Sequence, residues 1–350
     1  MEQVKNNKSP ERILVTRFSA VGDIAMTIPL LYSLAESYPD KQFILVSRER
    51  FGRFLVNAPA NLLFEGVNLD DYKGLAGLYR LKKRLMKYRP DAIADLHDVL
   101  RTKILRLYLA LSGVKCASQQ KGRGEKRALV RQGSEKRQLK STFERYREVF
   151  VKLGLDFTPD FVSLYGTGKG DLAVLGDVVP AKGDDKWVGI APFARHGGKI
   201  YPAERLEKVV ALLSAQPSLK LFCFGNGKEE EAVVNAWCAK YPNVSSFIGK
   251  SDFGGELALI SNLDLMLSMD SANMHIASLV NTPVVSVWGA TSSLAGFLGW
   301  RQQSDDCVQL PLDCRPCSVF GDKPCRSGDY RCMQIEPQVV VDKILSKLGR

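Results

Sequence analysis

Ser268–Ser292 is the segment whose residue types and spacing most clearly indicate binding chemistry. It reads as the end of an apolar strand, a polar elbow at Asp270 and Ser271, a short helix and a second apolar strand. Both elbow residues favour a helix N-cap, so the N–H groups of Ala272 to Met274 have no partner within the helix. Such a helix start attracts anions, and His275 follows one turn later. The segment predicts a phosphate or pyrophosphate site; a buried structural role for His275 is the alternative.

Arg17–Leu30 is a second strand-to-helix elbow, and it carries a candidate proton acceptor. An apolar strand precedes it, Gly22 permits close approach of the backbone, and Asp23 lies at the start of the next helix. Doubly wound folds bind ligands at the carboxyl ends of their strands, so Asp23 could face a ligand there and take a proton. Asp is also a common N-cap residue, so simple helix capping is the alternative.

The elements around these elbows predict an α/β protein with parallel sheets. Apolar strands alternate with amphipathic helices through both halves of the chain, which is the pattern of right-handed crossover units. A length of 350 residues favours two domains. We expect domains at 1–165 and 186–336, a linker at 166–185, and a C-terminal helix at 337–350 that could return to the N-terminal domain.

The charge is concentrated in the first half of the chain. The net charge is +11, and residues 1–170 hold 31 Lys and Arg against 18 Asp and Glu. A basic domain suggests an acidic partner, such as a phosphorylated glycolipid, an anionic membrane surface or nucleic acid; a solvated basic surface is the alternative. No helix-turn-helix, RRM or KH signature is present, so we expect no nucleic-acid partner.

No membrane span and no secretory signal are expected. The chain lacks an apolar run of the roughly 20 residues that a transmembrane helix needs, and its first residues are polar. We therefore expect a cytoplasmic location.

Residues 121–140 contain eight Lys and Arg without a clean apolar period, and we expect them to form a mobile basic loop.

The two elbows together resemble the glycosyltransferase family 9 heptosyltransferases. The resemblance is carried by R-F-S-A-V-G-D near the N-terminus and by D-S-A-N-M-H-I-A-S-L-V-N-T-P-V-V-S-V-W-G-A-T-S near residue 280, and it extends over nearly the whole chain. It implies a GT-B architecture, with two Rossmann-like domains facing an interdomain cleft. The N-terminal domain would bind the acceptor and the C-terminal domain the nucleotide sugar, typically ADP-heptose. Family members act in lipopolysaccharide core assembly and invert the anomeric centre.

The resemblance also implies roles for individual residues. Asp23 would be the general base, and a partly buried setting that raises its pKa would help it. The implied donor-binding residues are Lys199, Glu229 (or its neighbour Glu230), Asp270, Ser271, Ala272 and His275. The implied acceptor-binding residues are Arg17, Ser19, Gly22, Lys121, Arg123 and Arg127. Where the family has Asp-Thr-Gly-x-x-His, this chain has Ser271 and Ala272 in place of Thr and Gly. The serine keeps a hydroxyl, but the alanine side chain leaves a ligand less room to approach the backbone.

For the Lys199 loop and the acidic run, ordinary structural roles are the alternatives. Gly197 and Gly198 would give the loop of Lys199 freedom to close on the donor phosphates. A solvated loop lysine is the other possibility. The run at Glu229 and Glu230 is equally typical of a helix first turn.

The resemblance also implies that the basic regions of the acceptor domain serve a partner at a membrane. Residues 80–89 and 121–140 would serve a phosphorylated, Kdo-bearing lipid A acceptor and the anionic inner face of the cytoplasmic membrane, with which we expect peripheral contact. The stripe formed by Leu78, Leu81, Leu85 and Tyr88 is more typical of a core than of a membrane contact.

Eight cysteines are present, and five of them follow the second elbow, from Cys307 to Cys332. The last four have the spacing C-x2-C-x7-C-x6-C, which could bind zinc; they are Cys314, Cys317, Cys325 and Cys332. We expect them instead to be packed thiols without a metal.

No Asp-x-Asp motif is present, so we expect neither a metal nor another cofactor. Two alternatives remain: the same fold acting on another nucleotide sugar or glycan acceptor, and a non-catalytic sugar-nucleotide-binding protein.

Overall fold

Residues 10–349 are described by a computed structural model, in which the chain forms two compact units. Of the described residues, the first unit comprises 10–121 and 142–161, and the second comprises 122–141 and 162–349. Each unit contains one parallel sheet, so the predicted α/β class with two doubly wound domains is confirmed. Within the described residues, no helix is long and apolar enough to cross a membrane.

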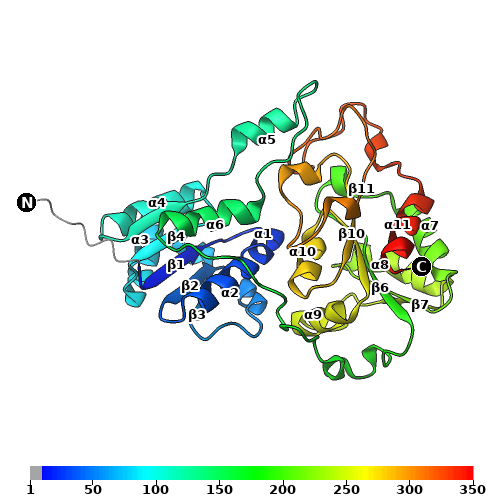
Figure 1. Cartoon of the computed structure of the whole chain (residues 1–350), viewed down its shortest axis with the longest axis horizontal. Helices are drawn as coiled ribbons and strands as arrows, with labels where there is room; N and C mark the ends of the chain where they lie inside the picture. Colours follow the sequence, from blue (N-terminus) through cyan, green and yellow to red (C-terminus); the bar gives the residue numbers. More distant parts are fainter. Residues whose placement is uncertain (1–9, 350) are drawn as a thin grey trace, which may run out of the picture. The chain divides into compact units, whose positions relative to one another are not determined.

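The first unit has a five-stranded sheet in the order β3-β2-β1-β4-β5 (Figure 1). Its strands are apolar and buried, as parallel strands covered on both faces must be. The strands are β1 (Arg12–Thr16), β2 (Gln42–Ser47), β3 (Leu62–Gly66), β4 (Ala92–Asp95) and β5 (Lys115–Ser118). The helices are α1 (Val21–Ala25), α2 (Ile28–Ser37), α3 (Gly74–Leu85), α4 (Leu100–Ala110) and α6 (Thr142–Lys152). Helices α3 and α4 pack against each other, as do α2 and α6.

The second unit has a six-stranded sheet in the order β11-β10-β9-β6-β7-β8. The strands are β6 (Lys186–Ala191), β7 (Leu219–Cys223), β8 (Val244–Ser246), β9 (Leu265–Met269), β10 (Val284–Val287) and β11 (Cys307–Val308). The helices are α5 (Arg123–Leu129), α7 (Ala203–Ser214), α8 (Lys228–Lys240), α9 (Phe253–Asn262), α10 (Ala272–Leu279) and α11 (Pro337–Lys347). The apolar side chains of α7, α8 and α11 form one core cluster with this sheet.

The strand order gives each sheet one switch point. In the first sheet, β2 and β3 follow β1 on one side, and the chain then returns to place β4 on the other side of β1. In the second sheet, β7 and β8 lie on one side of β6, and β9 lies on the other. Ligands bind at the carboxyl ends of the strands that flank such a reversal. The candidate residues of each unit should therefore lie where β1 and β4 end, and where β6 and β9 end.

Three segments differ from the sequence-based expectations. The expected basic loop contains a helix, α5, which is too short to show an apolar period; nearby Leu129 and Leu139 pack with Ala295. Both this segment and the expected linker at 166–185 belong to the second unit. The C-terminal helix α11 packs on α7, also in the second unit, which differs from the expected return to the N-terminal domain.

Candidate active site

Asp23 lies in the first turn of α1, just after β1 ends. Its Oδ2 accepts a hydrogen bond from the backbone N–H of Ala20 at 2.9 Å and forms an ion pair with Arg17. Within the described residues, no hydrogen bond reaches Oδ1, and the side chain is 30% exposed. The N-cap of α1 is Ala20, so the alternative that Asp23 is the N-cap residue is wrong: Asp23 is the third helical residue, and its Oδ2 accepts from the N-cap N–H. Its other oxygen remains available to accept a proton.

Arg17 positions Asp23 from the end of the same strand. Its side chain is 9% exposed, its Nη1 donates to the backbone oxygen of Leu96 at 2.7 Å, and its guanidinium lies 5.9 Å from the centre of the Tyr146 ring. Because Leu96 directly follows β4, this contact joins the carboxyl ends of the two switch-point strands. The sequence suggested Arg17 as an acceptor contact, whereas these contacts give it a positioning role toward Asp23.

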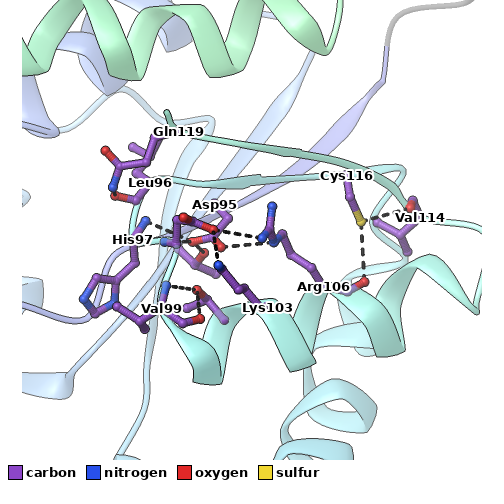
Figure 2. Close-up of polar contacts among 12 residues, drawn as sticks. Asp95, Leu96, His97, Val99, Lys103, Arg106, Val114, Cys116 and Gln119 are labelled. Atoms are coloured by element: carbon purple, nitrogen blue, oxygen red, sulfur yellow. Dashed lines mark hydrogen bonds and ion pairs between the residues drawn. The ribbon is translucent and has the colours of Figure 1, made fainter. Parts of the chain in front are cut away.

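A buried carboxylate, Asp95, fixes the loop that follows β4 (Figure 2). Its Oδ1 accepts hydrogen bonds from the N–H groups of His97 and Asp98, at 2.9 and 3.0 Å, and from the Thr16 hydroxyl at 3.1 Å. Its Oδ2 lies 3.2 Å from Nε of Arg106, whose Nη2 also pairs with Asp98. These contacts fix the backbone of the loop after β4. The imidazole ring of His97 points away from Asp95 (Figure 2).

His97 is the residue of this site that the sequence did not suggest. Its Nε2 lies 3.3 Å from the hydroxyl of Ser19, one of the predicted acceptor residues. Burial lowers the pKa of His97 to about 4, and the nearby cations Arg17 and Lys121 act in the same direction. At neutral pH the ring is therefore uncharged and can donate one hydrogen bond and accept another. The signal that could have found it is the run Asp95-Leu96-His97-Asp98, which places polar residues where a buried strand ends.

Lys199 and Asp270 form the centre of the second site. Asp270 directly follows β9, Lys199 lies in the segment after β6, and Lys199 Nζ is 2.9 Å from Asp270 Oδ2. The Thr291 hydroxyl donates to the same oxygen at 2.8 Å. The pair therefore lies at the switch point of its sheet, where a lysine held by a buried carboxylate can contact an anionic ligand.

The predicted elbow beside this pair has the expected structure of strand, helix and strand. Ser271 is the N-cap of α10, and its hydroxyl lies 3.2 Å from that of Ser268. Ser271 and Ala272 are partly exposed, whereas His275, one turn into the helix, is 7% exposed. The first N–H groups of α10 point out of the helix, as every helix start requires. The second site therefore places the start of α10 next to the Lys199–Asp270 pair, and a helix start of this kind favours anionic ligands.

Comparisons with known proteins decide the family. The model of Glycosyltransferase family 9 (heptosyltransferase) matches residues 78–326. The chain belongs to this family. It is therefore a glycosyltransferase, and its two doubly wound units are the two domains of a GT-B fold.

Individual relatives agree with this family 9 assignment. Lipopolysaccharide heptosyltransferase 3 of Escherichia coli is 26% identical over 326 residues, which cover 91% of this chain and 89% of the relative. Lipopolysaccharide core heptosyltransferase OpsX of Haemophilus influenzae is 27% identical over 296 residues, 80% of each protein. The solved structure of E. coli heptosyltransferase WaaC with ADP matches at a TM-score of 0.65 and 17% identity, covering 96% of this chain and 99% of WaaC.

Gly198 and Arg315 support the second site of this glycosyltransferase. A Cβ on Gly198 would lie 2.9 Å from the Cβ of Ala290, so close packing explains this glycine better than loop freedom does. Arg315, in the cysteine-rich segment, is buried and donates to the backbone oxygens of Gly289 and Thr291, at 2.5 and 3.0 Å. It thereby fixes the residue whose hydroxyl holds Asp270. Neither role could be read from local sequence.

The remaining predicted residues of this glycosyltransferase lie as follows. Glu229 is exposed in the first turn of α8, whereas Glu230 accepts a hydrogen bond from the N–H of Asn226 at 2.7 Å. Lys121 ends a segment of the first unit, but Arg123 and Arg127 lie on α5 in the second unit. The structure thus does not unite these three cations within one unit. Gly22 lies in the first turn of α1, next to Asp23.

The four clustered cysteines of this family 9 chain are free thiols. Cys332 is buried, Cys317 and Cys325 are partly buried, and Cys314 is exposed. Burial raises the pKa of Cys332 to about 11. Among residues 10–349, no group of three or more His, Cys, Asp or Glu side chains is arranged to hold a metal ion.

A substitution at His97 tests the electrostatics of the first site. The pKa of this ring in the folded protein, about 4, lies below the ordinary value of 6.5. As pH falls, His97 is therefore protonated in the unfolded chain before it is protonated in the folded protein. The neutral ring contributes to the stability of the fold above pH 6.5, and this contribution is lost as pH falls toward 4. As pH falls from 7 to 4.5, the free energy of unfolding of His97→Gln should decrease by about 1–2 kcal/mol less than that of wild type. Urea unfolding at both pH values measures it, and a His97 pKa above 6 from NMR titration would contradict it.

Proposed function

We propose that this chain is an inverting heptosyltransferase that moves heptose from ADP-heptose to a phosphorylated, Kdo-bearing lipid A acceptor of the lipopolysaccharide core. The observation that carries the proposal is the pair of switch-point sites, with a carboxylate oxygen of Asp23 available in one unit and Lys199 beside a phosphate-binding helix start in the other. Supporting it, two relatives are named as lipopolysaccharide heptosyltransferases, and WaaC was solved with ADP.

In the proposed mechanism, Asp23 takes the proton of the attacking acceptor hydroxyl. The hydroxyl oxygen forms a bond to the anomeric carbon of the donor as the bond to the diphosphate oxygen breaks on the opposite face, which inverts the configuration. The proton ends on Asp23, held in place by Arg17, and Ser19 and neutral His97 orient the acceptor. The leaving diphosphate gains negative charge, which Lys199, His275 and the N–H groups at the start of α10 stabilise.

The proposed acceptor also sets where the enzyme works. A lipid A derivative is embedded in the cytoplasmic membrane, so a cytoplasmic enzyme must reach it at the inner face. We therefore propose peripheral membrane contact through the basic first unit, in which residues 74–89 carry six Lys and Arg and no acidic residue.

A thermal-shift panel of nucleotides tests the donor. At about 100-fold excess over its Kd, a ligand of the folded state adds about 2.7 kcal/mol, so we expect ADP to raise the Tm by about 5 °C while UDP and GDP leave it unchanged. The proposed donor site has Ser271 and Ala272 where the family motif has Thr and Gly, so this panel addresses the part of the motif in which this chain differs from the family. A shift with UDP or GDP alone would favour the second candidate, the same chemistry on a different nucleotide sugar.

A further inference from the structure

Helix α4 has an apolar face that no part of the described chain covers. Leu100, Leu107 and Leu111 are 76%, 57% and 77% exposed, and their spacing of seven and four residues puts them on one side of the helix. The opposite side, formed by Leu105 and Leu109, is fully buried in the core of the first unit. A helix that is apolar on both sides is normally covered on both, so the outer face of α4 is a candidate interaction surface.

The same surface continues onto α3, which lies against α4 (Figure 1). The Tyr79 ring of α3 meets the Tyr108 ring of α4 edge to face, with centroids 5.7 Å apart. Tyr79 is 46% exposed and Leu75, one turn earlier, is 61% exposed. We call the set Leu75, Tyr79, Leu100, Leu107 and Leu111 the α3–α4 patch.

Lysines surround this patch and fix the charge of whatever covers it. The Nζ atoms of Lys82 and Lys83 lie 5.7 and 5.2 Å from the centre of the Tyr79 ring. Lys87 is exposed one turn later, and Lys103, 49% exposed, lies on α4. A second copy of this chain would bring lysines against lysines across a twofold interface, which like-charge repulsion opposes. The partner should therefore be apolar and anionic together.

We propose that the α3–α4 patch docks this enzyme on an anionic lipid bilayer. The leucines and Tyr79 enter the interfacial region, while the lysines meet lipid phosphates. The position of the patch agrees with the proposed function, on which this inference rests for its biological meaning. Leu100 lies three residues after His97, so the patch begins beside the loop proposed to orient the acceptor. A lipid-borne acceptor would then present its sugars to the site from the membrane that α4 contacts.

Vesicle co-sedimentation with the full chain tests the patch. We expect wild type to bind vesicles of phosphatidylglycerol and phosphatidylcholine, and to bind vesicles of phosphatidylcholine alone at least about tenfold more weakly, because each lysine near an anionic surface contributes about fivefold. The variant Leu107→Glu/Leu111→Glu should lower binding to the anionic vesicles by at least about tenfold, since it places charge where apolar side chains insert. Lys82→Gln/Lys83→Gln should lower it similarly and weaken its salt dependence.

The control variant is Val174→Glu/Val339→Glu, which changes two valines of the second unit that are 65% and 52% exposed. It should bind as wild type does. Equal vesicle binding by the patch variant, or a wild-type dimer that the patch variant dissolves, would overturn the proposal. All these measurements use lipid without any sugar substrate, so they stand or fall separately from the heptose transfer. Far-UV circular dichroism and the Tm without ligand check that each variant is folded.

Discussion

Asp23→Asn is expected to lower the turnover number of sugar transfer by about 100- to 10,000-fold, the usual contribution of a general base. An asparagine oxygen can still accept the hydrogen bond from the N–H of Ala20, so the start of α1 should persist. What disappears is the oxygen that can bind a proton. Initial rates at saturating donor and acceptor measure the effect, and calorimetry should give an unchanged Kd for ADP because the proposed nucleotide site lies in the second unit.

Asp91→Asn is the matched control for this experiment. Asp91 lies at the opposite end of the same pair of strands, and its Oδ2 accepts hydrogen bonds from the N–H groups of Glu11 and Arg12, at 3.1 and 2.9 Å. It resembles Asp23 in being a carboxylate bound to backbone N–H groups beside β1, but it lies at the amino edge of the sheet, where doubly wound folds do not bind ligands. A near wild-type rate for Asp23→Asn would rule out the general-base assignment, as would an equal loss in Asp91→Asn.

The sequence predicts those parts of the site that depend on one segment at a time. Asp23 and Asp270 each lie at an elbow between an apolar strand and a helix, and that local pattern is what predicts them. The contacts that organise them come from other strands, because the switch-point order places β4 beside β1 and β9 beside β6. Leu96, His97 and Thr291 join the sites only through this order, which no local pattern contains.

The helices show the same division between local and long-range information. The inner stripe of α3 was correctly predicted as core, because Leu78, Leu81 and Leu85 recur at helical spacing and are buried. The outer face of α4 could not be separated from its inner face, since the helix is apolar on both sides and only packing reveals which side the sheet covers. Helix α5 was missed because it is short and basic, and its association with the second unit depends on long-range contacts of Leu129 and Leu139.

Lys199→Ala is expected to weaken ADP binding by about 10- to 100-fold, because hydrogen bonds to charged groups contribute about 1.5–3 kcal/mol. Two effects act in the same direction. The substitution removes the cation nearest the predicted diphosphate position, and it leaves Asp270, which is 4% exposed and 2.9 Å from Lys199 Nζ, without its counter-ion. The remaining carboxylate then repels the diphosphate. Calorimetry with ADP measures the change in Kd.

Lys182→Ala and a double substitution separate these two effects from a general loss of structure. Lys182 pairs with Asp264 at 3.0 Å at the amino end of β9, the strand whose carboxyl end carries Asp270. Asp264 also pairs with Lys186 at 3.3 Å, so the loss of Lys182 removes one of two lysine partners at the sheet edge opposite the ligand edge. The Kd for ADP should stay within about twofold in Lys182→Ala, as expected for a group outside the site. Lys199→Ala/Asp270→Asn should bind ADP more tightly than Lys199→Ala alone, because the repelling charge is gone. If ADP affinity falls equally in Lys182→Ala and Lys199→Ala, Lys199 supports the fold rather than the nucleotide.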